Sequence, residues 1–294
     1  MKTLFSLVSC FALAVSAFAA EDHVDGIVRD ILANVARIKA ADPAAVPMAF
    51  WDFDGTIIKG DVSDGLVENG EQRFAGLAER TIREGLCTVY AGEEGVKRFR
   101  ADYTRFVEIG RWFGWPFLAQ MLNGVESDRI DRFCAGEYDR TYRHWYFAAS
   151  VRMLAALEKA GVENYIVSAS PEIFVRNAAE SLNLPRSRFR GIRVEESGGC
   201  LTERVIHPIP CGEGKVENVR DLVLARPHGV AVAGFGNSYS TDGAFLRYIA
   251  TQPSLPGGAK GISVMINGGK VKSGYTEHFR CVDQEETCGC PTKR

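Results

Sequence analysis

The chain has 294 residues, of which 46% are hydrophobic and 24% are charged, and its formal net charge is -2. This length and this composition are those of a globular protein that buries a core of its own. The charge balance gives no basic footprint, so we expect no nucleic-acid partner.

The first 20 residues have the pattern of a secretory signal peptide. Lys2 supplies a positive start, and the apolar run that follows ends at Phe18, beside small residues suited to cleavage. The run is too short and wrongly flanked for a membrane-spanning helix. We therefore expect residues 1–20 to be removed after Ala19 or Ala20, leaving an exported protein, periplasmic or secreted, without stable membrane insertion.

Lipidation is the alternative fate of the N-terminus, because the residues before Cys10 also fit a lipoprotein box. The apolar run continues for eight residues beyond Cys10, where a lipoprotein box would close it, so removal of the signal peptide is preferred.

Export would place the remaining cysteines in an oxidising compartment, where disulfide bonds are the first expectation and metal ligation the second. Cys200 and Cys211 flank a predicted turn and could pair, while the other pairings stay open and the odd count leaves one thiol over. A zinc site is not expected, because Cys288 and Cys290 lack a second pair of ligands nearby. Seven cysteines remain after cleavage: Cys87, Cys134, Cys200, Cys211, Cys281, Cys288 and Cys290.

An amphipathic helix is expected over residues 22–41, and four short apolar runs that follow it predict buried parallel strands. Three of the runs end in a polar or glycine-rich turn that leads into a helical pattern, which predicts an α/β fold with a Rossmann-like, doubly wound parallel sheet. In such sheets ligands bind beyond the carboxyl ends of the strands, where the polar turns lie. The runs cover residues 48–51, 164–167, 229–234 and 262–266.

A long segment without a strand pattern interrupts the alternation after the first strand. It is rich in helix formers and aromatic residues, so we expect a helical cap domain inserted into the core, and residues 190–206 read as a β-hairpin. The expected division is a signal peptide over 1–20, a core over 21–60 and 150–275, a helical cap over 61–149, and a Cys-rich tail over 276–294.

The sequence Asp52-Phe53-Asp54-Gly55-Thr56 closes the first strand and is the strongest chemical signal in the chain. One carboxylate can attack an electrophile while the other handles the proton. An exposed Asp-Gly turn is the ordinary alternative. A calcium loop is excluded, because its closing position holds Ser63 instead of an acid.

This motif resembles that of the haloacid dehalogenase superfamily, whose phosphatases carry Asp-x-Asp-Gly-Thr after the first strand. The resemblance implies that Asp52 is the nucleophile and that Asp54 is the general acid and base. It also implies that Ser168 binds a phosphoryl oxygen and that Lys215 neutralises the nucleophile and the phosphate, with Thr56 and nearby N–H groups on the remaining oxygens. Taken singly, such a serine is usually a turn residue and such a lysine is usually solvated.

The fourth motif of the superfamily supplies acidic metal ligands, and here it departs from the family pattern. Asn237 stands where the first acid is usual, and Asp242 falls at the second. The resemblance implies Mg²⁺ held by Asp52, the backbone carbonyl of Asp54, and Asn237 or Asp242. An amide oxygen suits Mg²⁺ but brings no charge, so a catalytically impaired, phosphate-binding relative stays open.

The predicted function is hydrolysis of a small phosphomonoester through an aspartyl-phosphate, with a phosphotransferase as a further alternative. The hairpin and the segment before Lys215 look most like those of phosphoserine and phosphorylcholine phosphatases. Aromatic residues of the cap either form its core or build a cage for a quaternary ammonium group. The candidates for such a cage are Trp112, Trp115, Tyr142, Trp145 and Tyr146.

Overall fold

The fold is described from a computed structural model that covers residues 23–269, 273–274 and 278–289. The expected signal peptide, with Cys10, and the last residues, with Cys290, lie outside this range. Within it, no helix combines the length and the apolar character needed to cross a bilayer.

A seven-stranded sheet forms the centre of the molecule, in the order β6-β5-β4-β1-β7-β8-β9. Every neighbouring pair is parallel except β5 and β6, which form the expected antiparallel hairpin. This confirms the predicted α/β fold. The strands are β1 Val46–Trp51, β4 Glu163–Pro171, β5 Phe189–Ser197, β6 Cys200–Ile206, β7 Gly229–Gly236, β8 Ile262–Ile266 and β9 Phe279–Val282.

The central strand β1 is apolar on both faces because both faces of the sheet are covered. Met48 and Phe50 join the apolar cluster on one face, and Ala49 and Trp51 join the cluster on the other. The Trp51 ring stacks on Phe235 of β7, with 3.6 Å between ring centroids. A continuous apolar run is therefore what this position in the sheet requires.

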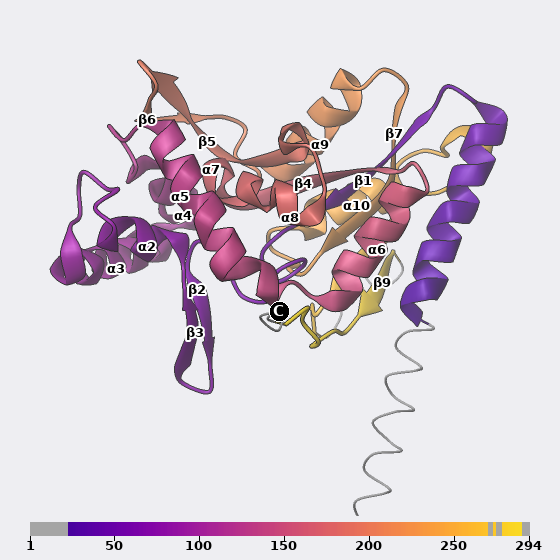
Figure 1. The fold of residues 1–294 in the computed structure, drawn as a ribbon. Helices are drawn as coiled ribbons and strands as arrows, with labels where there is room; N and C mark the ends of the chain where they lie inside the picture. The colour runs from indigo at the N-terminus through magenta and orange to yellow at the C-terminus, as the bar shows by residue number, and fades with distance from the viewer. Residues whose placement is uncertain (1–22, 270–272, 275–277, 290–294) are drawn as a thin grey trace, which may run out of the picture.

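Helices α9 (Glu213–Ala225) and α10 (Gly243–Thr251) pack on the face that carries Phe50. The other face is covered by the helix of residues 23–41 and by α6 (Ala148–Lys159), which lie side by side in Figure 1. The apolar positions expected along the first helix are all buried, which confirms its predicted orientation: Val24, Ile27, Ile31, Val35 and Ile38.

The remaining helices belong to the cap and to the connections of the sheet. The cap elements α2 and α3 lie at the opposite end of the molecule from the helix of residues 23–41 (Figure 1). The helices are α2 Leu77–Arg83, α3 Gly92–Ile109, α4 Arg111–Gln120, α5 Ser127–Arg140, α7 Glu172–Val175 and α8 Ala179–Leu182, with short 3-10 helices η1 Tyr142–Trp145, η2 Arg176–Ala178, η3 Arg186–Arg188 and η4 Pro256–Gly258.

The expectation that the cap contains no strand is wrong. Strands β2 (Gly65–Glu68) and β3 (Glu71–Ala75) form a hairpin that projects from the cap in Figure 1. Its turn is Asn69-Gly70, with positive φ at both residues, which is a strong two-residue hairpin signal. The strands themselves carry little apolar pattern, since Phe74 is their one buried residue.

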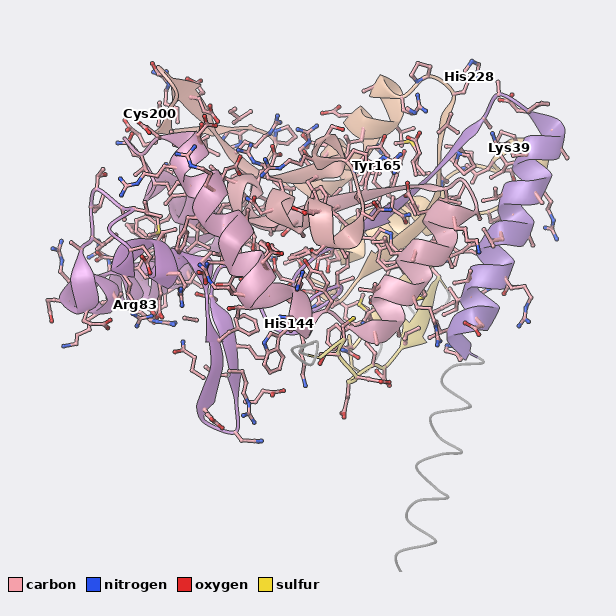
Figure 2. All side chains as sticks on the ribbon, in the orientation of Figure 1. Lys39, Arg83, His144, Tyr165, Cys200 and His228 are labelled. Carbon is pink, nitrogen blue, oxygen red and sulfur yellow. The ribbon has the colours of Figure 1, made fainter. Side chains whose placement is uncertain are left out.

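The cysteines of the described chain are free thiols, so the expectation of disulfides is not met there. Cys200 begins β6, at the hairpin turn where Figure 2 labels it, whereas Cys211 follows the far end of that strand. A seven-residue strand is about 20 Å long, and a disulfide needs Cα atoms within about 7 Å, so the suggested pairing of Cys200 with Cys211 is wrong.

The segment expected to be a Cys-rich tail contributes a strand to the sheet. β9 pairs in parallel with β8, and Cys281 is aligned with Met265. The side chain of Gln284 then turns inward and donates to the carbonyl of Thr56 at 3.1 Å. The C-terminal segment is therefore fastened to the sheet by backbone pairing and by a buried amide.

A matched pair of leucines tests the packing of the helices on the sheet. Leu157 of α6 is fully buried, whereas Leu224 of α9 is 82% exposed. We expect Leu157→Ala to lower the free energy of unfolding by about 2–5 kcal/mol, because it removes buried methyl groups and leaves a cavity. Leu224→Ala should change it by less than about 0.5 kcal/mol. Urea unfolding of both variants measures the difference, and similar losses would contradict the arrangement.

Candidate active site

Polar residues from separate segments meet at the carboxyl end of β1. Asp52 and Asp54 follow β1 directly, while its two neighbours in the sheet, β4 and β7, bring Ser168 and Asn237. Lys215 reaches the same point from the first turn of α9. The structure therefore brings together the residues of all four predicted motifs, at the edge where parallel sheets bind ligands.

Gly55 lets the first motif approach the fourth. Its φ is +73°, in the left-handed region, and a Cβ atom at this position would lie 1.9 Å from the side-chain amide nitrogen of Asn237. A side chain here would therefore meet both backbone strain and a clash. Glycine is required for the Asn237 amide to lie against the turn that holds the two aspartates.

Lys215 is fully buried and bridges two carboxylates. Its Nζ lies 2.6 Å from Asp52 Oδ1 and 2.5 Å from Asp242 Oδ1, and 5.4 Å from the centre of the Phe245 ring. Burial lowers the pKa of Lys215, but the two carboxylates outweigh burial and hold that pKa above its ordinary value. The ammonium group is therefore a fixed positive charge beside Asp52.

Asp242 accepts a hydrogen bond from Lys215 and does not line the cavity. Its Oδ2 accepts hydrogen bonds from the backbone N–H groups of Asn237 at 3.0 Å and Ser238 at 2.9 Å. With Oδ1 on Lys215, both oxygens have partners, and the side chain is fully buried. The geometry does not support Asp242 as a direct metal ligand and favours its role as the anchor of Lys215 and of the turn after β7.

Asp52 is held in one orientation between Lys215 and Thr56. Oδ1 accepts from the ammonium group, and Oδ2 accepts from Thr56 Oγ1 at 3.0 Å. Burial and then the charge of Asp242 raise the pKa of Asp52 to about 7, against the opposing effect of Lys215. Thr56 is itself fully buried, so its hydroxyl orients the carboxylate and does not face the cavity as the predicted phosphate contact requires.

Asp54 accepts three hydrogen bonds. The N–H of Val62 donates to Oδ1 at 2.7 Å, and the hydroxyls of Ser168 and Ser170 donate to Oδ2 at 3.1 and 2.8 Å. Burial and then the charge of Asp52 raise the pKa of Asp54 to about 6, while these donors lower it. An acid with a pKa in this range can both give and take a proton near neutrality.

A cavity of about 190 Å³ lies between this cluster and the cap. Asp61 lines it beside Asp54, and burial followed by the charges of Asp54 and Asp64 raises the pKa of Asp61 well above its ordinary value. No lysine or arginine is among its lining residues, which are Asp52, Asp54, Asp61, Tyr103, Trp115, Leu118, Ala169, Ser170, Asn237, Ser238 and Thr241.

Sequence reasoning missed Asp61, Tyr103 and Ser170. Asp61 could have been found as a third acid in the segment that carries Asp52 and Asp54. Ser170 could have been found as a second hydroxyl two residues beyond Ser168. Tyr103 lies inside helix α3, where no motif marks it.

The structure brings only one residue of the proposed aromatic cage to the cavity. Trp115 lines it, with one contact already made by the Arg111 guanidinium, 5.9 Å from the ring centre. Trp112 lies in another hollow, between α3, α4 and the segment after β6, and is 52% exposed. The others belong to the cap core: Tyr142 and Trp145 pack on Phe74, and Tyr146 packs on Phe53.

The residues at the cavity fit a divalent cation. No group of three or more acidic, histidine or cysteine side chains within the described ranges has a metal-binding arrangement, as expected where Asn237 replaces an acid. Asp52 and Asn237 nevertheless offer a carboxylate and an amide to the same space, and Mg²⁺ prefers such oxygen donors. Three carboxylates line the cavity and only Asp52 is paired with a cationic side chain, the buried Lys215, so a cation in the cavity would relieve their remaining repulsion.

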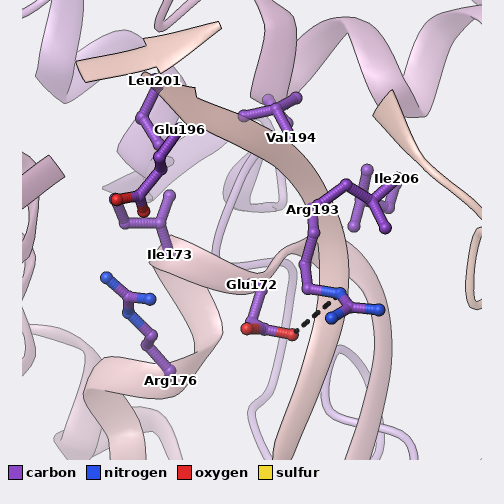
Figure 3. Close-up of a pocket in the computed structure, with 10 residues that line it drawn as sticks. Glu172, Ile173, Arg176, Arg193, Val194, Glu196, Leu201 and Ile206 are labelled. Atoms are coloured by element: carbon purple, nitrogen blue, oxygen red, sulfur yellow. Dashed lines mark ion pairs between the residues drawn. The ribbon is translucent and has the colours of Figure 1, made fainter. Parts of the chain in front are cut away.

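A larger cavity of about 260 Å³ lies beside the β5–β6 hairpin and contains none of the motif residues. Figure 3 shows Glu172 and Arg193 pointing toward one another across it, with 3.8 Å between Oε2 and Nε. Arg176, on its far side, is held by two hydrogen bonds to Asp131. Its charged lining residues already have partners within the protein, so the smaller cavity is the better candidate for the chemistry.

Comparison with known proteins agrees with this geometry. The chain matches the family model described as haloacid dehalogenase-like hydrolase over residues 49–247. Its fold is similar to a protein of unknown function from Bordetella pertussis Tohama I, with 15% identity, a TM-score of 0.61, and coverage of 82% of this chain and 99% of that chain. It is also similar to a conserved protein of unknown function from Anaerococcus prevotii DSM 20548, with 16% identity, a TM-score of 0.56, and coverage of 84% and 87%.

No curated protein matches the chain. The two structural likenesses show the fold, and the family match covers more than half of the chain, from before Asp52 to beyond Asp242. The resemblance expected from the four motifs is thereby confirmed, and the chain belongs to the haloacid dehalogenase-like hydrolase family.

Proposed function

We propose that the protein is a Mg²⁺-dependent phosphomonoester hydrolase that forms an aspartyl-phosphate on Asp52. The observation that carries the proposal is the position of Asp52, oriented by the buried Lys215 ammonium group at one end of a cavity that Asp54 also lines. A nucleophile and a proton donor thus line one small space, and a fixed cation lies directly behind the nucleophile.

In the first step an oxygen of Asp52 attacks phosphorus, and the bond from phosphorus to the ester oxygen breaks. The electron pair of that bond stays on the ester oxygen, which takes a proton from the Asp54 carboxyl group. The products are an aspartyl-phosphate and the free alcohol. Lys215 stabilises the negative charge on the phosphoryl oxygens next to Asp52.

In the second step a water oxygen attacks phosphorus, and Asp54, now ionised, accepts a proton from that water molecule. The bond between phosphorus and the Asp52 oxygen breaks, its electron pair returns to the carboxylate, and inorganic phosphate leaves. Ser168 lies beside Asp54 and is buried in this structure, and the family resemblance supports its hydroxyl turning to a phosphoryl oxygen when the substrate is bound. Mg²⁺, held by Asp52, the backbone carbonyl of Asp54 and Asn237, would supply further charge neutralisation at the phosphoryl group.

The substrate that best suits the cavity is a small phosphomonoester whose alcohol carries a positive charge, as in phosphorylcholine. The volume of about 190 Å³ suits a small molecule. Asp61 supplies a carboxylate, and Tyr103 and Trp115 supply aromatic surface, while no cationic side chain among the lining residues could receive a second anion. These features support a cationic alcohol more than a polyanionic one.

Export to the periplasm or the medium is part of the proposal and rests on the sequence of residues 1–20. Expression in a bacterial host with its export machinery should yield a processed protein in the periplasmic or secreted fraction. Its N-terminal residue should be Ala20 or Glu21. A mature protein that retains Met1, or one lipidated at Cys10, would contradict this part of the proposal.

The role of Asp52 is tested by Asp52→Asn, assayed on a panel of phosphomonoesters with Mg²⁺ and after treatment with EDTA. We expect hydrolysis to fall at least about 10⁴-fold, because an amide oxygen is a poor nucleophile. EDTA should abolish the wild-type activity, and added Mg²⁺ should restore it. Rapid acid quenching with a radiolabelled substrate should trap the label on the wild-type protein and not on the variant.

Asp221→Asn, an exposed acid on α9, is the matched control and should keep full activity. Thermal unfolding of both variants separates loss of chemistry from loss of fold. Equal hydrolysis by wild type and Asp52→Asn would defeat the nucleophile assignment. Binding of phosphate without any turnover would favour the alternative that Asn237 leaves a phosphate-binding protein.

The role of Asp61 is tested with phosphorylcholine and its neutral isostere, in which carbon replaces the quaternary nitrogen. We expect Asp61→Asn to lower the ratio of kcat/KM for the charged over the neutral substrate about tenfold or more, because a bound cation favours the ionised form of Asp61 and the amide cannot supply that charge. Glu108→Gln, an exposed acid on α3 that does not line the cavity, should change the ratio by less than about threefold. An unchanged ratio in Asp61→Asn would refute the preference for a cationic alcohol.

A further inference from the structure

The two serines that flank Ala169 both donate to the same oxygen of Asp54, and they differ in their exposure to the cavity. Ser170 Oγ donates to Asp54 Oδ2 at 2.8 Å and Ser168 Oγ donates to it at 3.1 Å. Ser170 lines the cavity but is only 4% exposed, and Ser168 is fully buried. Water therefore hardly competes with these two hydrogen bonds, which strengthens them.

A third serine fixes the direction of the Ser170 proton. Ser63 Oγ donates to Ser170 Oγ at 2.9 Å, so the hydroxyl proton of Ser170 is left free to point at Asp54. Ser63 is itself anchored, because its backbone N–H donates to Asp61 Oδ1 at 2.7 Å and its side chain is 1% exposed. The chain of donors thus runs in one direction, from Ser63 through Ser170 to Asp54.

Asp54 is held from its other side by the neighbour of Ser63. The N–H of Val62 donates to Oδ1 at 2.7 Å, while Ser170 donates to Oδ2. Two donors on two oxygens fix both the position and the plane of the carboxylate. The segment after β1 and the end of β4 are thereby joined through the carboxylate of Asp54.

We infer that Ser170, aligned by Ser63, is the positioning residue for the general acid Asp54, an inference that rests on the proposed function. When Ser168 turns to a phosphoryl oxygen, Ser170 is the hydroxyl that stays on Asp54 Oδ2. The carboxyl group is then kept within reach of the ester oxygen, which takes its proton as the bond to phosphorus breaks. In this role Ser170 acts through its hydrogen bond to Asp54 and forms no bond to phosphorus or to the ester oxygen.

If Ser170 positions Asp54, its loss should affect substrates differently according to the basicity of their leaving group. An alkoxide leaving group is strongly basic and needs the proton from Asp54, whereas a nitrophenolate leaves without much help. A displaced Asp54 therefore slows the reaction of alkyl phosphates more than that of p-nitrophenyl phosphate. The ratio kcat/KM isolates this step, because it reports events up to the first irreversible one and excludes the later hydrolysis that all substrates share.

The experiment measures kcat/KM of wild type and Ser170→Ala with Mg²⁺ over a series of aryl and alkyl phosphates. We expect kcat/KM for the alkyl phosphates to fall about 10- to 100-fold, and that for p-nitrophenyl phosphate to fall less than about threefold. The plot of log kcat/KM against the pKa of the leaving alcohol therefore becomes steeper in Ser170→Ala.

Three further variants separate positioning from a general loss of structure. Ser170→Thr keeps the hydroxyl and should restore the wild-type slope. Ser63→Ala leaves Ser170 in place without its aligning donor, and should steepen the slope by a smaller amount. Ser263→Ala removes a buried hydroxyl of β8, two strands from β1, that donates to the carbonyl of Leu246 and has no bond to Asp54, and it should leave the slope unchanged.

The outcomes distinguish this inference from the function on which it rests. A wild-type protein inactive on every phosphomonoester overturns the proposed function and the inference with it. An active wild type whose Ser170→Ala variant loses aryl and alkyl substrates equally overturns the inference alone. If Ser170→Ala does not fold, Ser63→Ala decides instead, and an unchanged slope in that variant also overturns it.

Discussion

The buried ammonium group of Lys215 is the constraint on which the site depends. A charge taken fully out of water is costly unless it is paired and hydrogen-bonded, and here two carboxylates from different parts of the chain pair with it. Asp52 comes from the end of β1, and Asp242 comes from the turn that leads into α10. The pairing therefore fixes α9, β1 and that turn relative to one another. It also explains why the Asp242 side chain is turned toward Lys215 and is absent from the cavity lining.

The parts of the fold that could be predicted from the sequence are those whose burial leaves a continuous signal. β1, β4, β7 and β8 are covered on both faces, so each reads as an apolar run, and the motif residues follow at their carboxyl ends. β9 is a short edge strand that is buried only at its two end residues, and the β2–β3 hairpin has one buried residue. Neither has an apolar run, and only the Asn-Gly turn of the hairpin was available as a signal.

The cavity wall on the cap side could not be predicted, because composition does not say which face of a helix meets which neighbour. Trp112 and Trp115 are three residues apart on α4, yet one lies in an exposed hollow and the other faces the catalytic cavity. Tyr142 and Tyr146 look like ligand contacts in the sequence, but their hydroxyls are taken by the Ala75 carbonyl and by Ser181. Aromatic density therefore located the cap and not its binding surface.

The amide at position 237 is best understood together with Asp61. Asp52, Asp54 and Asp61 already bring three carboxylates to the cavity, and neighbouring charges contribute to the raised pKa of each. An aspartate at 237 would add a fourth carboxylate to the same lining and raise these pKa values further. Asn237 keeps an oxygen donor beside Asp52 without that charge. The amide thus limits the negative charge beside Asp52, while Asp61 keeps a carboxyl group on the cap side of the cavity.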